Sequence, residues 1–126
     1  ICVVENSNKN TVFSLEERVD LAKKSLENIK NIEVIPFSGL LVDFATKLNA
    51  KVILRGLRVV SDFEYEFQMS SMNKKLNNNI ESIFLTPSES YAFLSSSLVK
   101  EIAQLGGDVS TFVNKDVKIA LEEKYK

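Results

Sequence analysis

Four short apolar runs alternate with helix-forming segments along the chain. The runs cover residues 1–4, 32–35, 52–54 and 83–85. Continuous apolar runs of this length are typical of strands that are buried on both faces, as in parallel sheets. Parallel strands need long crossover connections, and a segment with helical periodicity follows each run. The pattern therefore predicts an α/β fold built on a doubly wound parallel sheet.

The connecting segments carry helix start and stop signals. Ser14 and Glu17 have the spacing of a capping box, and a helix over 15–26 is expected behind them. Ser61 and Glu64 repeat that spacing before a long helix that reaches about residue 76. Further helices are expected at 40–48, at 95–105 before a Gly-Gly pair, and at 115–125. Helices and strands thus alternate from end to end.

Length and composition fit one ordinary globular domain over residues 1–126. The chain is 44% hydrophobic and 26% charged, and its formal charge is −1. This charge lacks the basic excess that sequence-independent nucleic-acid binding requires. No apolar run approaches the ~20 residues that span a bilayer. We therefore expect a cytoplasmic protein whose partners are neither nucleic acid nor membrane.

The chain contains no histidine and a single cysteine, Cys2. The missing histidine excludes Ser-His-Asp and Cys-His catalysis from these residues, together with the commonest zinc sites. One cysteine cannot form an internal disulfide. Any chemistry must therefore use lysine, arginine, carboxylates, hydroxyls and the backbone.

The candidate site consists of the segments that follow the four predicted strands. These are residues 5–13, 37–41, 55–58 and 86–97, and in an open parallel sheet such segments gather at one edge, where ligands bind. Arg55 and Arg58 flank Gly56, so two guanidinium groups could meet a phosphate chain close to the backbone. Two solvated arginines in a turn are the plainer alternative.

Other residues in these segments could also contact an anion. Ser95, Ser96 and Ser97 stand at a predicted helix start, where backbone amides and the helix dipole favour phosphate, although one serine could simply cap the helix. Lys9 adds a cation to the first loop, where most lysines are merely solvated. Asp62 and Glu66 suit a helix dipole, and a nucleotide or magnesium contact is the sharper alternative.

Four strings together carry a family resemblance. They are FSLEERV at 13–19, RGLR at 55–58, DFEYE at 62–66 and SSSLVKE at 95–101. In this order and spacing the chain closely resembles the bacterial phosphopantetheine adenylyltransferases, nucleotidyltransferases with a Rossmann-like fold. The resemblance extends over nearly the whole chain. It implies transfer of an adenylyl group from ATP to 4′-phosphopantetheine, which gives dephospho-coenzyme A and pyrophosphate.

The resemblance also implies roles for individual residues. Lys9, Leu41 and Arg55 would hold 4′-phosphopantetheine, and Lys9 and Arg58 would be the catalytic cations at the reacting phosphates. The residues implied for ATP are Gly56, Leu57, Arg58, Glu66, Tyr91, Ala92, Phe93, Leu94, Ser95, Ser96 and Ser97. The resemblance also implies that Mg²⁺ assists the reaction, and it implies no protein ligand for this ion. A homohexamer and feedback by coenzyme A are further implications.

One part of the family pattern has no counterpart in the sequence. The family's first strand, the glycine turn behind it and the HxGH motif with its catalytic histidine are missing, and the chain opens directly on an apolar run. In the family that strand lies between the strands that match 1–4 and 52–54. We therefore expect an N-terminally incomplete domain with a segment upstream of Ile1.

Two other interpretations compete with the adenylyltransferase. A non-catalytic nucleotide-binding or interaction module could use the same sheet, particularly without the missing strand, and it would bind ATP without turnover. A signalling receiver domain has a similar strand and helix rhythm, but it needs a phosphorylatable Asp at a strand end. Here the third predicted strand is followed by Arg55.

Overall fold

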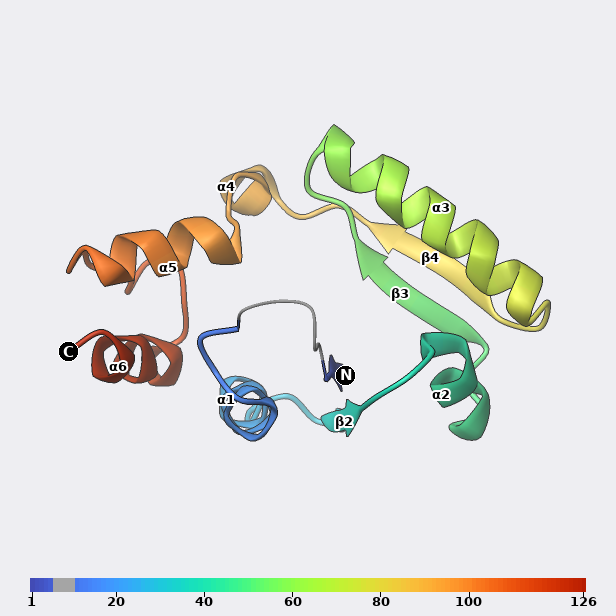
Figure 1. Ribbon diagram of the computed structural model, residues 1–126, viewed down its shortest axis with the longest axis horizontal. Coiled ribbons are helices and arrows are strands. Elements are labelled where there is room, and N and C mark those ends of the chain that lie inside the picture. Colours follow the sequence, from blue (N-terminus) through green and yellow to red (C-terminus); the bar gives the residue numbers. More distant parts are fainter. Residues whose placement is uncertain (6–10) are drawn as a thin grey trace. The chain divides into compact units, whose positions relative to one another are not determined.

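The computed structural model describes residues 1–5 and 11–126 and confirms an α/β fold with parallel strands (Figure 1). The chain divides into two compact units. The first unit combines residues 1–38 with 94–126, and the second unit covers 39–93. Within the described part of the chain, no helix is both long and apolar enough to cross a membrane.

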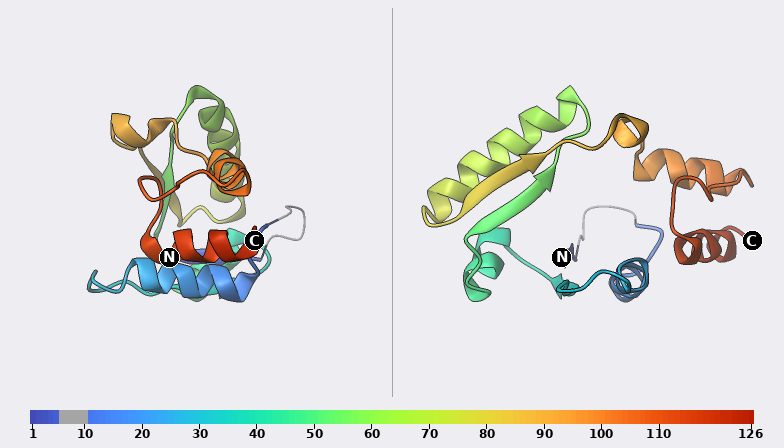
Figure 2. Two further views of the ribbon diagram at one scale, coloured as in Figure 1. Left: turned by 90° about the vertical axis from the view of Figure 1, so that its left-hand side faces the viewer. Right: turned by 180° about the vertical axis from the view of Figure 1, so that it is seen from behind.

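The second unit is built on two parallel strands joined by a long helix. Strands β3 (Val52–Gly56) and β4 (Glu81–Leu85) pair in parallel, with Leu54 opposite Ile83. Helix α3 (Val60–Leu76) makes the crossover and lies along the strand pair, as Figures 1 and 2 show. Helices α2 (Leu41–Lys47) and α4 (Glu89–Ala92) complete the unit. Its buried core consists of Val42, Ala45, Ile53 and Ile80.

The described residues of the first unit form the other strand pair and three helices. Strands β1 (Cys2–Val4) and β2 (Ile35–Phe37) are parallel and are connected through α1 (Leu15–Ser25). Helices α5 (Ser96–Gln104) and α6 (Lys115–Lys124) pack together. The buried core of this unit is formed by Val99, Val109 and Leu121.

Strand β2 lies further along the chain than the sequence indicates. The apolar run was expected to end before Pro36, but β2 is centred on Pro36, which lies opposite Val3. The Ile35 amide donates to the Ile1 carbonyl at 2.9 Å, and the Glu5 amide donates to Phe37 at 2.8 Å. In a parallel pair only alternate residues bond to a given neighbour, so the missing N–H of proline costs this pairing nothing.

Only one of the two predicted capping boxes forms. The Glu17 amide donates to Ser14 Oγ at 3.1 Å, and the Ser14 amide donates to Glu17 Oε2 at 2.7 Å. The box at Ser61 and Glu64 is wrong, because α3 already begins at Val60. Ser61 is therefore inside the first helical turn, where a residue lacks the extended backbone that a cap needs.

Candidate active site

The arginine pair lies at the carboxyl end of β3, as expected, but Arg55 and Gly56 belong to the strand itself. The sequence predicted that the strand would end at Leu54, whereas pairing continues to Gly56 opposite Leu85. The Leu57 amide then donates to the Leu85 carbonyl at 2.9 Å. Pairing with β4 therefore holds the backbone of Arg55, Gly56 and Leu57 rigidly at the strand end.

Arg55 forms a two-pronged ion pair with Glu66 of α3. Arg55 Nε donates to Glu66 Oε2 at 2.9 Å, and a terminal nitrogen donates to Oε1 at 2.5 Å. The Glu66 side chain is only 11% exposed, while that of Arg55 is 45% exposed. This bond to Glu66 raises the pKa of Arg55, against the opposing effect of burial. Arg55 is thus a permanently charged cation held in a fixed orientation.

Arg58 is held by Asp62, one helical turn before Glu66 on α3. The Asp62 carboxylate accepts the Arg58 backbone amide at 3.2 Å, Arg58 Nε at 3.1 Å and a terminal guanidinium nitrogen at 3.4 Å. These bonds from Arg58 lower the pKa of Asp62 below its ordinary value. Asp62 therefore stays ionised and fixes both the main chain and the side chain of Arg58.

This arrangement presents two oriented guanidinium groups with a net charge close to zero. Two arginines and two carboxylates balance formally, so an anion would be attracted mainly by directional N–H donors and less by a long-range positive field. A guanidinium has five N–H donors, and Arg55 uses two of them on Glu66. The remaining donors can bind phosphate oxygens without breaking that pair. Preorganised donors of this kind stabilise charge that develops in a transition state.

The remaining predicted residues of the second unit are apolar or lie on α4 and its end. Leu41 begins α2 and packs against the buried core of the unit. Tyr91 and Ala92 belong to α4, and Phe93 follows it. Tyr91 and Phe93 are exposed, as a surface for stacking a base would be. Lys9 lies outside the described residues.

The serine stretch belongs to the first unit. Ser95 caps α5, because its Oγ accepts the Leu98 amide at 3.2 Å. Ser96 and Ser97 occupy the first turn of this helix, and Leu94 packs against the core of the unit. One serine is thus used as a cap, and the phosphate role of Ser96 and Ser97 stays a prediction.

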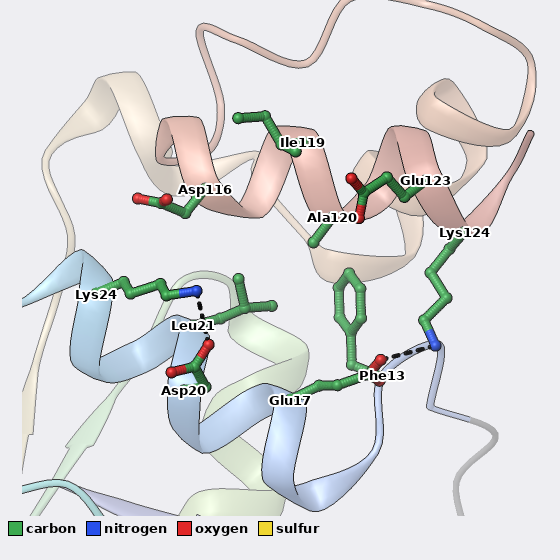
Figure 3. A pocket seen from close by; sticks show the side chains of 10 residues that line it. All are labelled: Phe13, Glu17, Asp20, Leu21, Lys24, Asp116, Ile119, Ala120, Glu123 and Lys124. Carbon is green, nitrogen blue, oxygen red and sulfur yellow. Dashed lines mark ion pairs between the residues drawn. The ribbon is translucent and has the colours of Figure 1, made fainter.

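A groove of about 450 Å³ lies between α1 and α6 in the first unit (Figure 3). Lys124 pairs with Glu17 at 2.9 Å across it, and Lys24 pairs with Asp20 at 2.8 Å along its rim. The bond to Lys124 contributes most to lowering the pKa of Glu17. Phe13, the last residue of the predicted segment 5–13, lines the groove, and its other lining residues lie outside the four predicted segments. Its charges help to hold α6 against α1.

The described residues do not assemble a magnesium site of their own. Among them, no three His, Cys, Asp or Glu side chains cluster as metal ligands. Asp62 and Glu66, the acidic residues in contact with the arginine pair, are engaged with Arg58 and Arg55. Sequence reasoning treated these carboxylates as dipole partners or as nucleotide or magnesium contacts, and it missed the ion pairs. The eleven-residue separation of Arg55 and Glu66 gives no local signal.

Two sequence comparisons identify the family of this chain. The cytidylyltransferase-like family matches residues 1–102. The phosphopantetheine adenylyltransferase of Staphylococcus haemolyticus (strain JCSC1435) is 52% identical over 126 residues, which are 100% of this chain and 78% of that protein. Both matches include the RGLR strand end and α3. The chain therefore belongs to the cytidylyltransferase-like family and, within it, to the phosphopantetheine adenylyltransferases.

Proposed function

We propose that this protein transfers an adenylyl group from ATP to 4′-phosphopantetheine, which yields dephospho-coenzyme A and pyrophosphate. One observation carries the proposal: two arginines are fixed at the carboxyl end of β3, each by a carboxylate of α3. The 52% identity with a phosphopantetheine adenylyltransferase supplies the substrate pair. Both substrates carry phosphate, which arginine side chains at a strand end are suited to bind.

The reaction is a displacement at phosphorus. A phosphate oxygen of phosphopantetheine attacks the α-phosphorus of ATP, and a new P–O bond forms as the bond to pyrophosphate breaks. No bond to the protein is made, so catalysis rests on positioning and on neutralising negative charge. Arg55 would hold the attacking phosphate, and Arg58 would hold the phosphates of ATP that depart.

The other predicted contacts complete the proposal. Leu41 and Lys9 would contact phosphopantetheine, and Lys9 would also contact the reacting phosphates. Gly56, Leu57 and Glu66 would border the nucleotide, as would the stretch from Tyr91 to Ser97. ATP would enter as its magnesium complex, because the described residues offer no separate cluster of metal ligands.

We further propose that the protein is a homo-oligomer, a hexamer by resemblance. Phe63 and Phe67 stack on α3 with ring centroids 5.8 Å apart, and both are more than half exposed. Met72 and Leu76 are further exposed apolar residues of the same helix. Such surfaces mark contacts with other proteins. A cytoplasmic location and feedback by coenzyme A are the remaining predictions about its setting.

Pyrophosphate release tests the proposed function. The complete native protein is incubated with magnesium and ATP, with and without 4′-phosphopantetheine, and dephospho-coenzyme A is identified by mass spectrometry. We expect release only when both substrates are present. ATP binding without turnover in the presence of phosphopantetheine would instead favour a non-catalytic nucleotide-binding module.

A further inference from the structure

We infer that Asp62 is a positioning residue, which fixes Arg58 for the ATP phosphates. The inference rests on the proposed function, and it gives a reason for an acidic residue in a site that binds polyanions. Asp62 would repel ATP if it contacted the nucleotide directly. Its carboxylate oxygens instead accept hydrogen bonds from Arg58.

The first argument is that one carboxylate holds Arg58 at both ends. Asp62 Oδ2 accepts the Arg58 backbone amide at 3.2 Å and the Arg58 Nε at 3.1 Å. An arginine side chain is long and flexible, and each bond that it makes reduces the number of rotamers that it samples. The two bonds to Asp62 close the Arg58 side chain into a ring and restrict its rotamers before the substrate arrives. Preorganisation of this kind raises the rate, because ordering is not required during binding or reaction.

The second argument is the anchoring of Asp62 itself. Asp62 lies in the first turn of α3, and its amide donates to the Val59 carbonyl at 3.0 Å. The side chain of Asp62 is 25% exposed, whereas that of Arg58 is 42% exposed. Asp62, the less exposed partner, belongs to the 17-residue helix α3, and Arg58, the more exposed partner, belongs to the short connection between β3 and α3. Asp62 is therefore the fixed point, and Arg58 is the group that it orients.

A nearby acidic residue provides a matched control. Glu64 lies two positions further along α3, is exposed, and its side chain forms no ion pair or hydrogen bond with the described residues. Replacing Glu64 removes the same charge from the same helix turn without touching Arg58. If replacing Asp62 changes the kinetics and replacing Glu64 does not, the change is therefore due to the contact with Arg58 rather than to net charge.

A double-mutant cycle tests the inference in the complete native protein. The enzymes are wild type, Asp62→Ala, Arg58→Ala and the double variant, with Glu64→Ala as control, and kcat/KM is measured separately for ATP and for phosphopantetheine. We expect Asp62→Ala to lower kcat/KM for ATP about tenfold, because this is the size of the effect of losing one hydrogen bond to a charged group. The double variant should be no worse than Arg58→Ala alone, because Asp62 has nothing left to position. Glu64→Ala should match wild type.

Each outcome of this cycle decides a different statement. Additive losses, or an Asp62→Ala variant with unchanged kcat/KM for ATP, would overturn the inference. Asp62→Asn, which keeps an acceptor for the Arg58 amide, replaces the alanine variant if thermal unfolding shows that alanine prevents folding. Wild-type protein without turnover would refute the proposed function instead. In that case the Kd for ATP is measured by calorimetry for the same set of variants, and it decides whether Asp62 acts through Arg58.

Discussion

Replacing Arg55 by alanine tests the strand-end site most directly. Two of the five guanidinium donors are bonded to Glu66, which leaves three for a substrate phosphate. A bidentate contact from these donors contributes about 2–3 kcal/mol, since hydrogen bonds to charged groups are worth about 1.5–3 kcal/mol. This corresponds to a loss of roughly 30- to 150-fold in kcat/KM for phosphopantetheine, at 1.36 kcal/mol for each factor of ten.

The assay follows initial rates of pyrophosphate release while phosphopantetheine is varied at saturating ATP. Arg55→Lys should fall between wild type and Arg55→Ala, because lysine keeps the charge but loses the planar fork. Lys51→Ala removes an exposed cation next to the opposite end of β3 and should leave the rates unchanged. It is the matched control for a general effect of charge.

A second consequence of Arg55→Ala must be separated from the first. Glu66 is only 11% exposed and would lose its partner, so the variant should also be less stable. Thermal unfolding of each variant shows whether the assay temperature lies safely below the transition. A folded Arg55→Ala protein with wild-type kcat and KM for phosphopantetheine would refute the assignment of this arginine to the substrate phosphate.

Three further predictions concern ATP, the core and acid stability. Arg58→Ala should raise KM for ATP about tenfold or more while KM for phosphopantetheine stays near wild type; equal changes in both would argue against separate roles for the two arginines. Val109→Ala should lower the free energy of unfolding, measured by urea denaturation, by about 2 kcal/mol. Val109 is 1% exposed in the core of the first unit, and the substitution removes two methyl groups. An unchanged midpoint of urea unfolding would contradict that packing. The bond from Lys118, followed by those from Ser110, lowers the pKa of Asp108 from 3.8 to about 2. Because the folded value is depressed, the stabilisation by Asp108 is present above the unfolded pKa and is lost as the pH falls from about 4 to about 2. Wild type should therefore lose its stability advantage over Asp108→Asn in that window, and a constant difference across it would show that the Lys118 contact does not stabilise the fold.

Several features of the site could be read directly from the sequence. The alternation of apolar runs and helical segments determined the α/β class, because the two periodicities of burial are local properties of the chain. The position of Arg55 and Arg58 after a strand placed a candidate anion site at the carboxyl edge of that strand. The capping box of Ser14 and Glu17 was equally local, and it formed as predicted.

Other features depended on partners that are distant in sequence. Pairing with Leu85 extended β3 through Gly56, and pairing with β1 carried β2 across Pro36. The early start of α3 displaced the predicted cap at Ser61. In each case a hydrogen-bonded neighbour or a helical turn outweighed the local preference of the residues. A single segment of sequence does not predict such an effect.

The ion pairs show this division most clearly. The sequence supplied two arginines and two acidic residues and suggested separate roles for them. The packing of α3 against its strand pair placed Glu66 beside Arg55, eleven residues away, whereas Asp62 meets Arg58 only four residues away at the start of α3. Residue types and the order of strands and helices were determined by the chain itself, because they need only local information. The orientation of the charges was decided by tertiary structure, because an ion pair depends on which side chains the fold brings within a few ångströms.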